Sequence, residues 1–142
     1  MREITRIIVH CTASSQERTT IDGLKYWFKC RGWKNPGYHY VITPRGDTVQ
    51  MLRESLISNG AKGYNATAIN IAYIGGVDAD GKPQDNRTIE QKATLVHLLL
   101  QLRERYPKAL IIGHRDIWGA ESPERWQKAC PSFNATREYA DI

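Results

Sequence analysis

Two short apolar stretches, ITRIIVHC at residues 4–11 and LIIGH at residues 110–114, decide the fold. Both are rich in β-branched residues and too short for a core helix, so each is predicted to be a buried strand. Each ends near a histidine, His10 in the first stretch and His114 in the second. Because clefts form where the strands of an α/β sheet end, we expect both imidazoles beside a binding site. A lone histidine in such a place is more often a packing residue, so this interpretation needs a third ligand.

The sequence between these two strands predicts two helices and three further strands. The helices span residues 20–31 and 88–106, and the second opens with a capping box. The strands lie at residues 38–43, 48–52 and 69–75, the first two as a hairpin. This order predicts an α/β fold with a single mixed sheet of about five strands and helices packed on it. On the second helix, the residues expected to face the core are Ile89, Ala93, Val96, Leu99 and Leu100.

Composition limits the class of protein. The chain has 142 residues, of which 41% are apolar and 25% charged, which is ordinary for one globular domain and excludes disorder. No apolar run reaches the roughly 18 residues that a membrane span requires. The net charge of +5 suits an anionic partner, but no block of Lys and Arg concentrates it, so no nucleic acid is expected. Because the first residues do not form a secretory signal, we expect the protein to be cytoplasmic as synthesised. We also expect a monomer.

Three cysteines, Cys11, Cys30 and Cys130, cannot all pair with one another, which favours reduced thiols and a search for a ligand among them. Cys130 precedes a proline, which favours extended backbone, so Lys128 and Cys130 are predicted to face the same side. Two imidazoles and a thiolate form a sound zinc set, and three protein ligands are typical of a catalytic site. A surface lysine and a small buried side chain are the simpler interpretations of these two residues. Cys11 is expected to point to the opposite face of its strand from His10, into the core, and Cys30, near the end of a helix, to have no special role.

Four motifs together resemble a known family. They are HCTA at residues 10–13, GYHY at 37–40, AKGYN at 61–65 and KACPSF at 128–133. In this order they look like the zinc-dependent N-acetylmuramoyl-L-alanine amidases, especially the small phage lysozymes of amidase type. The animal peptidoglycan recognition proteins are more distant. The resemblance covers nearly the whole chain and implies one amidase catalytic domain over residues 1–142.

The resemblance implies roles for individual residues. His10, His114 and Cys130 would bind one Zn²⁺ ion, and Tyr38 would lie beside the attacking water. Lys128 would stabilise the negative charge of the tetrahedral intermediate. The reaction would be hydrolysis of the amide that joins the lactyl group of N-acetylmuramic acid in peptidoglycan to the L-alanine of the stem peptide.

Further residues near these motifs have two interpretations each. Tyr64 and Asn65 lie in a loop that borders the substrate cleft in this family, although ordinary loop chemistry explains them equally. Asp116 is either a partner of a ligand imidazole or, more simply, a cap. Trp118 and Trp126 form a cleft wall or pack against the sheet.

His39 is expected to face away from Tyr38 and to be structural, and His97, in the middle of a helix, to be either a surface or a packing residue. Two departures from the family pattern stand out. Gly60 replaces a histidine that many relatives carry, and the segment from His114 to Lys128 is longer than in the small phage enzymes.

Three other functions compete with a lytic amidase. A recognition module would bind muropeptides without cutting them, but such modules typically lack the cysteine ligand, which is present here as Cys130. A cytoplasmic recycling amidase usually has aspartate at that position. A nucleic-acid or protein-binding role has only the basic charge in its favour.

Overall fold

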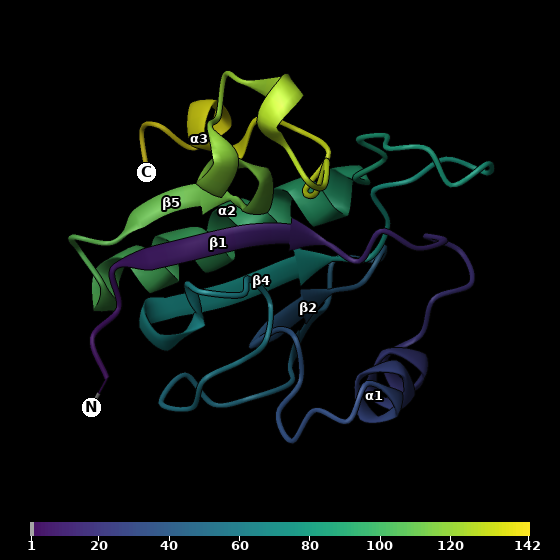
Figure 1. Ribbon diagram of the computed structural model, residues 1–142, viewed down its shortest axis with the longest axis horizontal. Helices are drawn as coiled ribbons and strands as arrows, with labels where there is room; N and C mark the ends of the chain where they lie inside the picture. The colour runs from purple at the N-terminus through teal and green to yellow at the C-terminus, as the bar shows by residue number, and fades with distance from the viewer. Residues whose placement is uncertain (1) are drawn as a thin grey trace.

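A five-stranded mixed sheet forms the centre of the structure, a computed structural model that describes residues 2–142 (Figure 1). Its strand order is β3-β2-β4-β1-β5, and the neighbours β2 and β4, β4 and β1, and β1 and β5 are parallel. β3 is antiparallel to β2, which confirms the hairpin. The strands are β1 (Arg6–Cys11), β2 (Tyr40–Ile42), β3 (Thr48–Gln50), β4 (Ala68–Tyr73) and β5 (Leu110–Gly113). The predicted α/β fold is therefore confirmed, with slightly shorter strands.

Three helices accompany the sheet: α1 (Ile21–Cys30), α2 (Ile89–Arg105) and α3 (Ala135–Glu138). The first two begin where the sequence predicts them. The Thr20 side chain accepts a hydrogen bond from the Gly23 N–H, and Thr88 forms its capping box with Gln91. Short 3-10 helices lie at Asn65–Thr67, His114–Trp118 and Pro123–Arg125. None of the helices in residues 2–142 combines the length and the apolar character that crossing a membrane requires.

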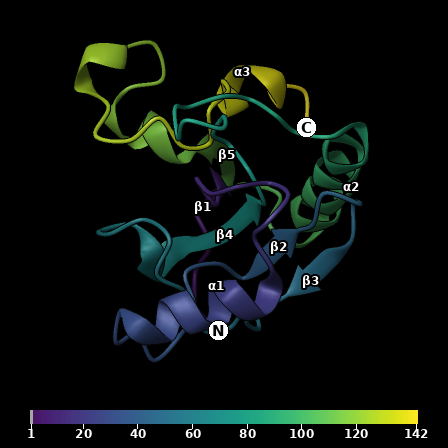
Figure 2. The same ribbon diagram turned by 90° about the vertical axis from the view of Figure 1, so that its right-hand side faces the viewer.

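Alternate residues of the central strands supply two packing layers, because successive side chains of a strand point to opposite faces. Ile7 and Val9 of β1 pack with the buried leucines of α2. Ile8, between them, packs with Ala61 of the loop that precedes β4. The other face also carries α1, whose Leu24 and Phe28 are buried. Figure 2 shows α1 and α2 on opposite sides of the sheet.

The prediction for the buried face of α2 was wrong except at Leu99. The residues that face the core are Gln91, Leu95, Leu98, Leu99 and Leu102. Ile89 is 83% exposed and Leu100 is 51% exposed. Apolar residues occur on several sides of this helix, so their spacing alone allows more than one rotation about its axis. The polar Gln91 decides between them, because its side chain reaches the sheet and donates to the Ile42 and Ile74 carbonyls.

Candidate metal centre

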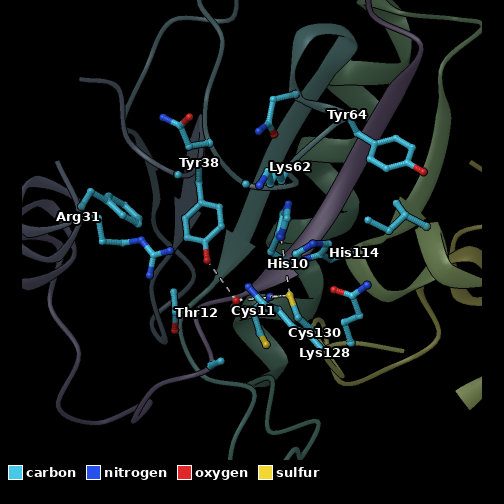
Figure 3. A pocket seen from close by; sticks show the side chains of 18 of the residues that line it. His10, Cys11, Thr12, Arg31, Tyr38, Lys62, Tyr64, His114, Lys128 and Cys130 are labelled. Atoms are coloured by element: carbon cyan, nitrogen blue, oxygen red, sulfur yellow. Dashed lines mark hydrogen bonds between the residues drawn. The ribbon is translucent and has the colours of Figure 1, made fainter. Parts of the chain in front are cut away.

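His10, His114 and Cys130 come together at the carboxyl ends of β1 and β5. β1 and β5 are parallel neighbours, and Val9 pairs with Gly113. The next residue of each chain segment is a histidine, so the two imidazoles meet, with ring centroids 4.7 Å apart. Cys130 arrives from the segment after the last 3-10 helix, and Figure 3 shows the three side chains converging. One ligand atom from each lies within 4.8 Å of the others, and the residues are only 1%, 6% and 9% exposed.

The spacing of these atoms fits zinc. Zinc bonds of about 2.0–2.1 Å to nitrogen and about 2.3 Å to sulfur in tetrahedral geometry separate the ligand atoms by about 3.5 Å. The distance between Cys130 Sγ and His10 Nδ1 is 3.7 Å. The Cys11 backbone N–H donates to the same sulfur at 3.2 Å and helps to orient it. Two imidazoles and a thiolate are also the donor types that zinc prefers, so the residues present fit this ion.

The surroundings keep both imidazoles neutral. Burial, the neighbouring His114 and the Lys128 charge hold the pKa of His10 well below its ordinary value. Burial and Lys128 lower the pKa of His114 to about 4. At neutral pH both rings therefore have a free nitrogen lone pair, which a metal ligand requires. Burial raises the pKa of the Cys130 thiol well above its ordinary value, so this group would lose its proton on binding a metal.

Asn70 is a site residue that the sequence analysis missed. It lies on β4, and its Oδ1 is 2.7 Å from His10 Nε2. Nε2 donates this hydrogen bond, which leaves Nδ1 facing Cys130. The signal in the sequence was an asparagine within the apolar run AINIAY at residues 68–73, and the structure shows that this asparagine is fully buried. A buried polar side chain on a central strand requires partners, and here one partner is a predicted metal ligand.

Tyr38 and Lys128 both line the cleft that also contains His10, His114 and Cys130. The Tyr38 ring lies beside His10, with ring centroids 5.2 Å apart, and its hydroxyl donates to the Cys11 carbonyl at 3.4 Å. Burial and the two nearby cysteines raise the pKa of Tyr38 well above its ordinary value, so it remains a phenol and a hydrogen-bond donor. Lys128 is an exposed residue that lines the cleft, and its positive charge lowers the pKa of both imidazoles.

The cleft has a volume of about 780 Å³, and the charged side chains that line it are all positive. Arg31, Lys62 and Lys128 line it, and among the described residues no Asp or Glu does. Trp27 and Trp33 hold the Arg31 guanidinium, which lies 5.3 Å and 4.5 Å from their ring centroids. The cleft therefore presents three cations on aromatic walls and favours an anionic ligand.

Tyr64 and Asn65, in the segment before β4, also line the cleft, and Figure 3 shows Tyr64 on the side opposite Arg31 and Tyr38. The Tyr64 ring packs against the Arg6 guanidinium, 5.2 Å from its centroid. Asn65 Oδ1 accepts from the Ala61 N–H at 2.8 Å and from Asn70 Nδ2 at 3.1 Å. The Asn65 oxygen therefore holds the loop together, while the residue still borders the cleft.

The tryptophans of the long segment after β5 divide between the two interpretations. Trp118 lines the cleft and stacks on His114, with ring centroids 5.2 Å apart. Trp126 lies outside the cleft lining, packs against the Arg115 guanidinium and donates to the Gly119 carbonyl. The segment thus supplies one wall residue and one packing residue.

The remaining expectations concern residues outside the metal cluster. Asp116 is a cap, because its Oδ2 accepts from the Gly113 N–H at 2.7 Å and from the Thr136 hydroxyl at 2.6 Å. His39 is fully buried, whereas His97 is exposed on α2. Cys11 packs in the core on the α2 side, and Cys30 is exposed.

The chain is similar to known proteins over most of its length. Residues 1–133 match the protein family described as N-acetylmuramoyl-L-alanine amidase. The endolysin of Enterobacteria phage K11 is 34% identical over 137 residues, which cover 96% of this chain and 85% of the relative. The endolysin of Escherichia phage T7 is 35% identical over 133 residues, 92% of this chain and 82% of that protein.

Solved structures show the same fold. The N-acetylmuramoyl-L-alanine amidase LysC from Clostridium intestinale URNW is 25% identical, with a TM-score of 0.77 over 97% of this chain and 83% of that one. Drosophila PGRP-LB, at 16% identity, shares the fold with a TM-score of 0.74 over 99% of this chain and 82% of its own. With its family match over nearly all residues, its endolysin relatives and its buried histidine–cysteine cluster, this chain belongs to the N-acetylmuramoyl-L-alanine amidase family.

Proposed function

We propose that this cell-wall amidase uses one zinc ion, held by His10, His114 and Cys130. Its reaction is hydrolysis of the amide between the lactyl group of N-acetylmuramic acid and L-alanine in peptidoglycan. One observation carries the zinc proposal. A buried pair of neutral imidazoles and a thiol, from three separate segments, place their ligand atoms within 4.8 Å of one another.

Zinc bound in such a site lowers the pKa of water to about 7 and polarises an amide carbonyl. The residues of the chain supply the rest. Lys128 places positive charge at the rim of the cluster, where negative charge develops on the carbonyl oxygen of the substrate. Tyr38 keeps its hydroxyl proton because it is buried, so Oη can turn from the Cys11 carbonyl, 3.4 Å away, and donate to a reacting group.

The cleft supports an acidic muropeptide as the substrate. A stem peptide carries free carboxylates on residues beyond its L-alanine, and the three cleft cations have no acidic partner among the residues that line it. Tyr64 and Trp118 provide aromatic surface for the sugar and peptide. We assign substrate contacts to Tyr64 and Asn65 on this basis.

A recognition module without activity is the alternative of a different class. The presence of Cys130 beside both histidines favours the enzyme, because binding alone requires no such set. We further propose that residues 1–142 act as one catalytic domain and as a monomer. The relatives named endolysins support synthesis in the cytoplasm followed by action on the cell wall.

The test combines metal content with cleavage. Purified protein is analysed for zinc and assayed for dye release from labelled peptidoglycan, beside Cys130→Ala and, as a matched control, Cys30→Ala at an exposed cysteine. We expect one zinc per chain, loss of activity only in Cys130→Ala, and a product mass that shows a freed L-alanine amine. Zinc without cleavage would support the recognition module, and no zinc after metal-replete purification would refute the site.

A further inference from the structure

A continuous chain of buried polar groups lies behind His10. Asn70, Ser58 and His39 are each fully buried, and each is within hydrogen-bond distance of the next. The distances are 2.7 Å from His10 Nε2 to Asn70 Oδ1, 2.8 Å from Asn70 Nδ2 to Ser58 Oγ, and 3.1 Å from Ser58 Oγ to His39 Nδ1. At the far end His39 Nε2 meets the Leu56 carbonyl at 2.7 Å. The three proposed zinc ligands do not by themselves require this series of hydrogen bonds.

The direction of the hydrogen bonds in this chain follows from the Asn70 backbone N–H, which can only donate and lies 3.1 Å from His39 Nδ1. Nδ1 is therefore an acceptor, and Nε2 of the neutral ring carries the proton toward the Leu56 carbonyl, with Arg2 Nη2 3.1 Å from the same nitrogen. Nδ1 receives the Asn70 backbone N–H at 3.1 Å and the Ser58 hydroxyl, whose oxygen therefore accepts from Asn70 Nδ2.

A second contact fixes the Asn70 amide independently. Asn65 Oδ1 already accepts from the Ala61 N–H, so it is an oxygen, and it also faces Asn70 Nδ2. The Asn70 oxygen must then face His10, and His10 must donate from Nε2.

We propose that Asn70 is a positioning residue for the metal centre, an inference that rests on the proposed zinc site. It locks the neutral His10 ring in the tautomer with its proton on Nε2 and so offers Nδ1, 3.7 Å from Cys130 Sγ, to the ion. It also ties the loop that carries Lys62 and Tyr64 to the metal ligand, because its other end binds Ser58 and Asn65 of that loop. One side chain thus links the substrate wall to the ligand.

The sequence around this side chain is shaped to admit it. A Cβ atom built on Gly60 would lie 2.6 Å from Asn70 Cγ and 2.7 Å from its Oδ1. The Asn70 amide therefore fills the space that a side chain at residue 60 would need. The Asn70 amide can occupy this position only because residue 60 in the loop is a glycine.

The first experiment measures the tautomer directly. Metal-free protein labelled with ¹⁵N-histidine is studied by two-bond ¹⁵N–¹H correlation spectra, and His10 is assigned from the spectrum of His10→Gln. We expect His10 with its proton on Nε2. A proton on Nδ1 in the wild-type protein would overturn the proposal.

The second experiment measures zinc affinity by competition with a chelator. We expect Asn70→Leu to weaken zinc binding about 10- to 100-fold and to leave His10 as a mixture of tautomers. Asn70→Asp keeps an acceptor for Nε2, so it should restore the tautomer and most of the affinity. Asn86→Leu is the matched control, because the Asn86 amide also accepts one hydrogen bond and donates another, at the Gly76 N–H and the Val77 carbonyl, but lies outside the metal cleft.

The outcomes separate this inference from the zinc proposal. A folded Asn70→Leu protein with the zinc affinity and tautomer of the wild type would refute the role of Asn70. Wild-type protein that binds no zinc would refute the metal site instead, and with it the positioning role.

Discussion

Gly60→Ala is the sharpest test of how the cleft loop packs on the sheet. The added Cβ would stand 2.6 Å from Asn70 Cγ and 2.9 Å from the Gly37 carbonyl oxygen. Carbon atoms in favourable contact are about 3.5–4.0 Å apart, so the methyl group is roughly 1 Å too close. The Gly37 carbonyl belongs to the backbone, and so the Asn70 amide has to move.

The cost follows from two terms. Overpacking a filled site costs about 1–3 kcal/mol, and leaving the His10 N–H without its buried acceptor costs about 1–3 kcal/mol. Gly60 does not have a positive φ, so alanine fits the backbone and regains about 0.4–1 kcal/mol through the unfolded chain. The net expectation is a free energy of unfolding lowered by about 2–4 kcal/mol.

The assay is urea unfolding of metal-free protein, repeated in an Asn70→Ala background. Removing the Asn70 amide removes the nearest atoms, so Gly60→Ala should cost at least about 1 kcal/mol less there than in the wild type. If the two costs agree within about 0.5 kcal/mol, the two residues are not coupled and the packing described here is wrong.

Three further predictions concern catalysis, pH and the C-terminal segment. Lys128→Met should lower kcat about 100- to 1000-fold while zinc content stays at the wild-type value, since its charge is needed only in the transition state; an unchanged kcat would remove it from the mechanism. For His114, whose folded pKa is about 4 against about 6.5 when unfolded, the unfolded chain binds the proton first as pH falls. The contribution of His114 to the stability of the metal-free protein should therefore be complete above about pH 6.5 and fall by up to about 1.4 kcal/mol per pH unit toward pH 4. His114→Asn should show a shallower slope in urea unfolding, and an equal slope would contradict the assignment. Arg87→Met should lower stability by about 2–3 kcal/mol in the same assay, because the Arg87 side chain is 2% exposed and pairs with the half-exposed Asp85 and Glu138; a loss below about 0.5 kcal/mol would show that this anchor of α3 contributes little.

Local patterns determine a large part of this protein. β-branched runs with a histidine at the end predict β1 and β5 and place His10 and His114 at one sheet edge. Helix starts are also predicted correctly from residues three positions apart, as with Thr88 and Gln91 in the capping box of α2. These features depend on neighbours in the chain, so the sequence alone carries them.

Tertiary structure alone decides which atoms meet across distant segments. The rotation of α2 depends on Gln91 reaching carbonyls of β2 and the end of β4, which no helical periodicity contains. The role of Asn70 likewise depends on the register of β1 against β4, which sets Ile8 beside Asn70 and brings the side chain to His10. The sequence predicts which residues can bind a metal. The hydrogen bond between His10 and Asn70, 60 positions apart, forms only when β1 pairs with β4.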